Sequence, residues 1–135
     1  MASNIAVPHD QEAAATLSQL RDLSLKPAQV RKLVAQLTAS LSKHVIQDLE
    51  GDEQIAVIVV LRSGLAMADT FLDAFPNEAD TVVYHIGLFR EKVSLQPVEY
   101  YNKLPQKSPR IKRAYVLDPM VATGGTAKAA INILK

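Results

Sequence analysis

The sequence predicts an α/β fold in which a parallel sheet follows N-terminal helices. The strongest observation is the apolar, β-branched run of residues 55–61, which is typical of a strand covered on both faces of a parallel sheet. Residues 81–86 and 113–117 also have strand character. Helix-like segments, residues 65–75 and 126–135, follow the first and third of these strands. Strands that alternate with helices favour a parallel sheet with helices on its faces.

The N-terminal part of the chain reads as two helices. In residues 12–23 apolar side chains recur at helical spacing, and Asp10 is placed to cap that helix. Pro27 suits the first turn of a second helix. The second helix is expected to end near Gly51, after this apolar stripe: Val30, Leu33, Val34, Leu37, Leu41, Val45 and Leu49.

A long polar and aromatic segment, residues 87–110, separates the second and third predicted strands. It contains Pro97, Pro105 and Pro109. Because connections of this length in compact domains are usually functional, we expect a loop or lid here.

Size and composition narrow the classes of protein that fit. The 135 residues, 48% of them hydrophobic, fit one globular domain with helices in 12–50 and an α/β core in 55–135. The net charge of +1 gives no indication of a basic face that would bind nucleic acid or membranes. The sequence has no cysteine, which excludes disulfides and thiolate metal sites. No signal peptide or membrane-spanning run is visible. We therefore expect a soluble, cytoplasmic protein.

The segment most informative about function is residues 114–126, AYVLDPMVATGGT. A strand ends at Asp118, a Gly-Gly turn follows, and a helix begins, at the edge where open α/β sheets bind ligands. Glycines let backbone N–H groups converge, Thr123 and Thr126 add hydroxyls, and the helix N-terminus favours an anion. This arrangement would hold a phosphate, with Asp118 facing sugar hydroxyls.

A plainer interpretation makes the glycines an ordinary turn and Asp118 a local cap. Neither GxxxxGK[ST] nor GxGxxG occurs, which removes the main support for ATP hydrolysis and for hydride transfer. The context favours a phosphorylated sugar.

Four motifs in order resemble one known family. DPMVATGGT (118–126) resembles the phosphoribosyl diphosphate (PRPP) motif of the uracil phosphoribosyltransferases, usually DPMLATGGS or DPMLATGGT. LRSGL (61–65) is similar to their LRAGL diphosphate loop, HIGLFR (85–90) to their strand-plus-arginine segment, and QPVEYYNKLP (96–105) to their PVEYYxKLP stretch. The resemblance implies a type I phosphoribosyltransferase core, a Rossmann-like parallel sheet.

The resemblance also implies roles for the matching residues. Asp118 would be the catalytic residue that faces the ribose hydroxyls, and Arg62 and Arg90 would contact PRPP. The implied PRPP segment, whose last five residues wrap the 5′-phosphate, is Asp118, Pro119, Met120, Val121, Ala122, Thr123, Gly124, Gly125 and Thr126. Diphosphate leaves as positive charge builds on the ribose, so a site with cations and a fixed sugar suits the reaction. Mg²⁺ is expected to accompany PRPP, and no protein metal site is predicted.

Three departures from the family pattern qualify these expectations. Ser63 stands where the family usually has alanine, a change that should spare phosphate binding. The stretch between Leu49 and Ile55 is short where relatives usually insert a β-hairpin arm that helps them dimerise. Nothing matches the family segment similar to YIVPGLGDAGDR, which supplies the uracil contacts. We therefore expect a C-terminally truncated chain without a base pocket.

The leading functional hypothesis is transfer of phosphoribose from PRPP to uracil, giving UMP and diphosphate in pyrimidine salvage. The alternative is a non-catalytic protein that keeps the phosphate cradle and binds PRPP or a nucleotide. The sequence leaves open the identity of the base, regulation by GTP and the number of subunits, a homo-oligomer included.

Overall fold

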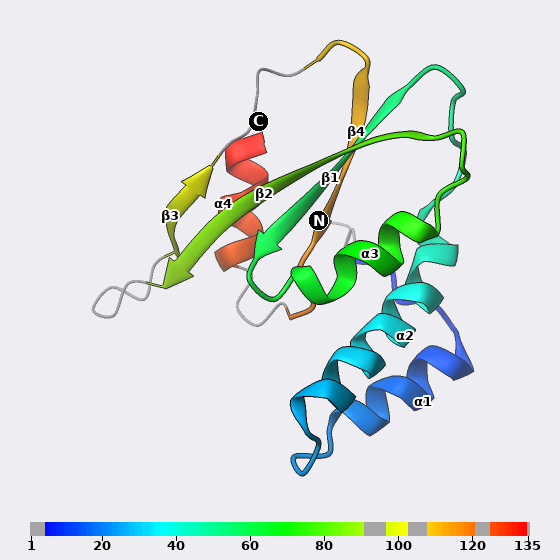
Figure 1. The fold of residues 1–135 in the computed structure, drawn as a ribbon, viewed down its shortest axis with the longest axis vertical. Coiled ribbons are helices and arrows are strands. Elements are labelled where there is room, and N and C mark those ends of the chain that lie inside the picture. Colours follow the sequence, from blue (N-terminus) through cyan, green and yellow to red (C-terminus); the bar gives the residue numbers. More distant parts are fainter. Residues whose placement is uncertain (1–4, 91–96, 103–107, 121–124, 135) are drawn as a thin grey trace.

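The computed structural model describes residues 5–90, 97–102, 108–120 and 125–134. Figure 1 shows the arrangement of its helices and strands. In chain order they are α1 (Gln11–Leu20), α2 (Pro27–Val45), β1 (Gln54–Leu61), α3 (Leu65–Asp73), β2 (Asp80–Arg90), β3 (Pro97–Asn102), β4 (Ile111–Leu117) and α4 (Gly125–Leu134). None of the helices in these ranges is long and apolar enough to cross a membrane.

The strands form one sheet in the order β3-β2-β1-β4. β1 is parallel to both of its neighbours, β2 and β4, which confirms the predicted parallel core. Residues 55–60 of β1 are all buried, as expected for a central strand covered on both faces.

The segment predicted as a long loop is partly strand. β2 continues to Arg90, and β3 pairs antiparallel with its end, with a register shift between Gly87 and Leu88. Pro97 is the first residue of β3, a position at which a sheet tolerates a residue without an N–H group. The prolines that suggested a loop therefore do not exclude an edge strand here.

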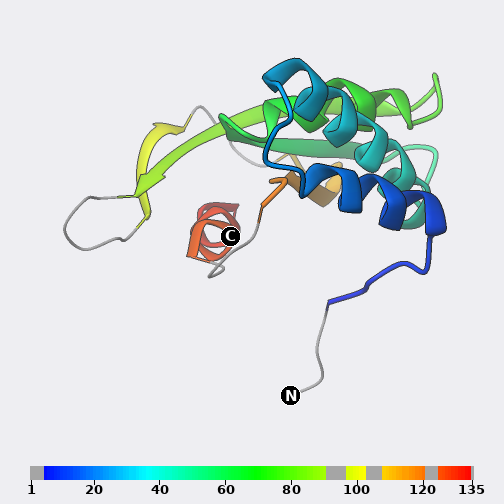
Figure 2. The same ribbon diagram turned by 90° about the horizontal axis from the view of Figure 1, so that it is seen from below.

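Helices cover both faces of the sheet. On one face the β1 residues Ile55, Val57 and Val59 pack with Phe71 and Phe75 from α3 and the loop after it. Alternate residues of a strand point to opposite faces. The other face is accordingly built from another set of core side chains, including some from α4: Ala56, Ile58, Ile86, Ile133 and Leu134. Figure 2 shows α4 on the opposite side of the sheet from α2 and α3.

The two N-terminal helices begin near the predicted places. Asp10 caps α1 by accepting the N–H of Ala13 at 3.1 Å, and Pro27 occupies the first turn of α2. α2 contacts both α1 and α3. The buried hydroxyls of Thr38 and Ser42 donate to carbonyls of their own helix, at 2.8 and 2.6 Å, so they need no partner outside it.

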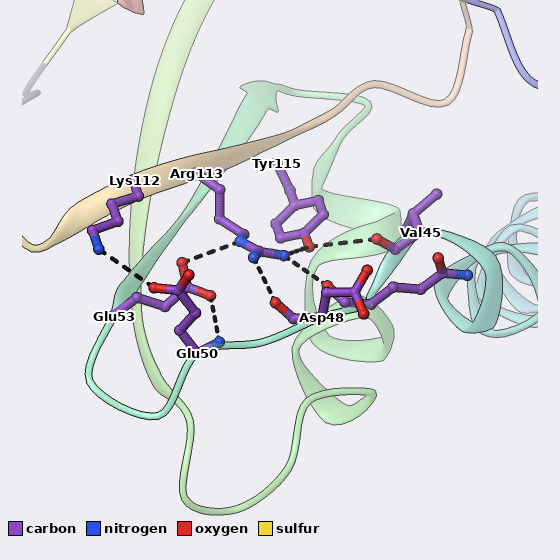
Figure 3. A network of polar contacts seen from close by, with 8 residues as sticks. Val45, Asp48, Glu50, Glu53, Lys112, Arg113 and Tyr115 are labelled. Carbon is purple, nitrogen blue, oxygen red and sulfur yellow. Dashed lines mark hydrogen bonds and ion pairs between the residues drawn. The ribbon is translucent and has the colours of Figure 1, made fainter.

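α2 ends at Val45, earlier than the apolar stripe predicted. Two β4 side chains bind carbonyls at and just beyond that point (Figure 3). Arg113 donates to the carbonyl oxygens of Gln47 and Asp48, each at 2.8 Å. The hydroxyl of Tyr115 donates to the carbonyl of Val45 at 3.4 Å. These contacts with β4 replace the helical bonds that would have continued α2.

Candidate functional site

The candidate site lies where β1 and β4 end side by side. The two strands are parallel and pair without a register shift from Ile55 and Arg113 to Val59 and Leu117, so the segments that follow them emerge at the same edge. Arg62, Ser63 and Gly64 follow β1, and Asp118 begins the segment that follows β4. This is the carboxyl edge at which open α/β sheets bind ligands.

Gly64 makes the close approach of the two strands possible. A Cβ atom at this position would lie 2.5 Å from the carbonyl oxygen of Leu117 and 2.7 Å from that of Val60, closer than real Cβ atoms come. The N–H of Gly64 donates to the carbonyl of Val60 at 2.8 Å. Glycine is therefore required here for space rather than for an unusual backbone angle.

A tight turn carries the chain from β1 into α3. The N–H of Leu65 donates to the carbonyl of Arg62 at 3.0 Å, and the N–H of Ala66 to that of Ser63 at 3.2 Å. The peptide bond between Leu61 and Arg62 is cis. Both Arg62 and Ser63 are exposed at the edge.

Asp118 is half-buried, and its Oδ1 atom accepts two hydrogen bonds. One comes from the N–H of Met120 at 3.3 Å, which closes a local turn. The other comes from the hydroxyl of Ser63 at 3.5 Å, across from the β1 segment. The first bond fits the plain interpretation of Asp118 as a cap, and the second connects the two segments of the candidate site.

The structure brings together some of the residues expected to bind PRPP. Arg62, Asp118, Pro119 and Met120 all lie at this edge, and Met120 is 76% exposed. Four others, Val121, Ala122, Thr123 and Gly124, lie outside the described residues.

The remaining expected residues belong to the adjoining elements. Gly125 and Thr126 begin α4, whose first turn lies at the same end of the sheet as the arrowhead of β1 (Figure 1). Helix N–H groups in a first turn carry partial positive charge. Arg90 ends β2, and its side chain is outside the described residues.

Sequence reasoning missed Ser63 as a site residue. The sequence predicts only that its replacement of alanine spares phosphate binding, whereas the structure shows its hydroxyl in contact with Asp118. Its place directly after a buried strand was the available signal, because side chains there lie at the ligand edge.

The described side chains of the candidate site could bind a metal ion only together with a bound phosphate ligand. Among the residues described, no group of three or more His, Cys, Asp or Glu side chains could hold a metal ion. Asp118 offers a carboxylate at the edge. Mg²⁺ is commonly bound by one or two carboxylates together with substrate phosphates, and Asp118 fits that arrangement.

Comparisons with known proteins agree on one family. The family model "Uracil phosphoribosyltransferase" matches residues 47–135. The protein urg2 of Schizosaccharomyces pombe is 44% identical over 133 residues, which cover 98% of this chain and 62% of that protein. The uracil phosphoribosyltransferase of Roseiflexus castenholzii is 38% identical over 136 residues, covering 88% of this chain and 64% of that one. The chain thus spans less than two thirds of the length of either relative.

A solved structure supports the fold. The AQ2163 protein of Aquifex aeolicus superimposes with a TM-score of 0.80 at 24% identity, covering 96% of this chain and 68% of that one. At this identity the likeness bears on the architecture alone.

Proposed function

The chain belongs to the uracil phosphoribosyltransferase family, and on that basis we propose that it binds PRPP at the edge formed by β1 and β4 and transfers the phosphoribose to uracil. The products would be UMP and diphosphate. The observation that carries this proposal is the placement of the Arg62–Ser63 turn against Asp118. This placement suits a ligand with a sugar and a diphosphate, because the turn that carries Arg62 lies against the Asp118 carboxylate through Ser63.

The roles of the residues follow from the charge that moves in the reaction. As diphosphate leaves the anomeric carbon, negative charge grows on the leaving group and positive charge on the ribose. Arg62 would bind the leaving diphosphate, since guanidinium stays charged and can hold two phosphate oxygens. Asp118 would accept hydrogen bonds from the ribose hydroxyls and hold the sugar in place.

The segment after Asp118 would hold the 5′-phosphate. Residues 122–126 would surround it, with Gly125 and Thr126 contributing from the first turn of α4. Arg90 would approach PRPP from the end of β2.

Mg²⁺ bound with PRPP would neutralise part of the diphosphate charge. Asp118 is the described residue best placed to share its coordination, with phosphate oxygens as the other ligands. The cytoplasmic location and the assembly of subunits stay predictions.

Calorimetric titration of the 135-residue chain with PRPP and Mg²⁺, followed by addition of uracil and an assay for UMP, tests the proposal. PRPP binding is the expected result, and UMP formation would show that residues other than the unmatched family segment hold the base. Binding without UMP would retain the PRPP site and refute transfer by this chain, leaving the non-catalytic binder. Absence of binding by a protein with an intact circular dichroism spectrum would refute the site itself.

A further inference from the structure

Ser63 and Asp118 form a contact between the two segments of the candidate site. The Ser63 hydroxyl lies 3.5 Å from Oδ1 of Asp118. We propose that Ser63 is a positioning residue, whose hydroxyl orients the Asp118 carboxylate toward the sugar of PRPP. This inference rests on the proposed function, because it assumes that Asp118 meets the ribose.

The two hydrogen bonds to Asp118 define how the carboxylate is turned. Both the Ser63 hydroxyl and the Met120 N–H reach Oδ1, so Oδ2 lies outside both bonds. Rotation about the last bond of an aspartate side chain is otherwise broad. Donors from two separate segments narrow that rotation and present Oδ2 as the oxygen for a sugar hydroxyl.

The backbone holds Ser63 in place independently of its hydroxyl. Its carbonyl accepts the N–H of Ala66 at 3.2 Å, and the next residue, Gly64, is packed against the carbonyls of Val60 and Leu117. Replacing Ser63 by alanine therefore removes the hydroxyl and keeps the turn. The substitution isolates the contact with Asp118.

The expected effect is moderate. A separation of 3.5 Å exceeds the range of about 2.5–3.0 Å usual for a hydrogen bond between two oxygens, so the contact is weak, and net contributions of such bonds are small. We expect Ser63→Ala to weaken PRPP binding about 5-fold. Ser63→Thr keeps the hydroxyl at an exposed position and should restore wild-type affinity.

Ser24 provides a matched control. Its hydroxyl also donates to an aspartate Oδ1 atom, that of Asp22 at 2.7 Å, in the connection between α1 and α2. Ser24→Ala removes a bond of the same chemistry away from the candidate site. It should leave PRPP affinity unchanged.

The test is titration of wild type, Ser63→Ala, Ser63→Thr and Ser24→Ala with Mg²⁺-PRPP and, separately, with diphosphate in the absence of Mg²⁺, so that a metal ion shared with Asp118 does not contribute. A positioning role predicts that Ser63→Ala weakens PRPP and leaves diphosphate binding unchanged, and that its effect vanishes in an Asp118→Ala background, which has no oxygen to orient. Equal weakening of both ligands would mean that Ser63 binds diphosphate directly, which overturns the inference. Unchanged PRPP affinity in Ser63→Ala also overturns it.

A ligand-free measurement separates this inference from the proposed function. The carboxyl ¹³C resonance of Asp118 should move in Ser63→Ala and return in Ser63→Thr. A wild-type chain that binds no PRPP would refute both proposals. A wild-type chain that binds PRPP, with an Asp118 resonance indifferent to Ser63, would refute the role of Ser63 alone.

Discussion

The guanidinium of Arg113 donates to the carboxylate of Glu53 across 3.1 Å and joins β4 to the segment that leads into β1 (Figure 3). The Glu53 side chain is 1% exposed, whereas that of Arg113 is 30% exposed. The pKa of Arg113 is raised, chiefly by its hydrogen bond to the Tyr115 hydroxyl and, against some desolvation, by the charge of Glu53. The guanidinium therefore stays charged, and through Glu53 it links β4 to the segment that precedes β1.

Removing Arg113 should destabilise the fold more than removing its neighbour Lys112. Arg113→Ala leaves the buried Glu53 carboxylate without its cation, and we expect the Tm to fall by about 5–10 °C. Lys112 pairs with Glu50 at 3.3 Å, but both side chains are more than 60% exposed. Lys112→Ala should change the Tm by only about 2 °C or less. Thermal melts of the two variants measure the difference, and equal losses would contradict a special role for Arg113.

A methyl group at position 64 should force the ends of β1 and β4 apart. Gly64→Ala places a Cβ 2.5 Å from the Leu117 carbonyl oxygen, and overpacking of this kind costs about 1–3 kcal/mol, occasionally more. Because Asp118 follows Leu117 directly, PRPP binding should weaken as well. Gly51→Ala is the control, since a Cβ there meets nothing within 4 Å. Urea unfolding compares the two, and a Gly64→Ala variant as stable as Gly51→Ala would refute the packing argument.

The parallel core could be predicted because its signal is local. The run of residues 55–61 has no polar interruption, and the observed strand, Gln54–Leu61, differs from the prediction by one residue at its start. Asp10 and Pro27 likewise act within their own helix turns. Such patterns depend on near neighbours in the chain, which a sequence displays directly.

The end of α2 and the presence of β3 depend on distant residues. Tyr115 binds the carbonyl of Val45 and Arg113 those of Gln47 and Asp48, and the helix sequence itself gives no sign of these contacts. β3 exists by pairing with β2, which a proline-containing polar segment does not suggest.

Only part of the candidate site could be read from the sequence. The ligand edge followed from the order of strand, acid and turn, whereas the contact of Ser63 with Asp118 required the pairing of β1 with β4. The roles assigned to Arg90 and to residues 121–124 stay predictions.

Asp10 should make the stability of the N-terminal helices depend on pH. The Ala13 N–H, and next the hydrogen bond with His44 at 3.2 Å, hold the pKa of Asp10 below its ordinary value. A carboxyl whose folded pKa is lowered stabilises the fold above its unfolded pKa, and that contribution is lost as the pH falls through the folded pKa. Asp10→Ala should therefore lower the Tm by a few degrees at pH 7 and by less below about pH 4. Asp69→Ala, at an exposed position on α3, is the control.

Melts of wild type and both variants at pH 7, 5, 4 and 3 give the comparison. The pKa of Asp22 is also lowered, by its hydrogen bonds with Ser24. Because Asp22 is present in both wild type and Asp10→Ala, the difference between their Tm values measures the contribution of Asp10. A Tm difference that stays constant from pH 7 to pH 3 would show that Asp10 caps α1 without the help of its charge.

Substitutions of Asp118 and Arg62 should weaken PRPP binding without unfolding the protein. Both side chains lie at the carboxyl edge rather than in the two cores, so the Tm of each variant should stay near that of wild type. A hydrogen bond to a charged group is worth about 1.5–3 kcal/mol, so we expect Asp118→Asn and Arg62→Ala each to weaken PRPP binding roughly 10- to 100-fold. Arg31→Ala removes an exposed cation on α2 and is the control for net charge.

Ribose 5-phosphate distinguishes the two roles, because it carries the sugar and the 5′-phosphate but no diphosphate. If Arg62 binds the diphosphate, Arg62→Ala should weaken PRPP and leave ribose 5-phosphate unaffected, whereas Asp118→Asn should weaken both ligands. Titration of each variant with each ligand at equal ionic strength keeps the screening of charges the same. If both variants bound PRPP as wild type does, neither residue could belong to the site, and the edge formed by β1 and β4 would lose its assignment as the place where PRPP binds.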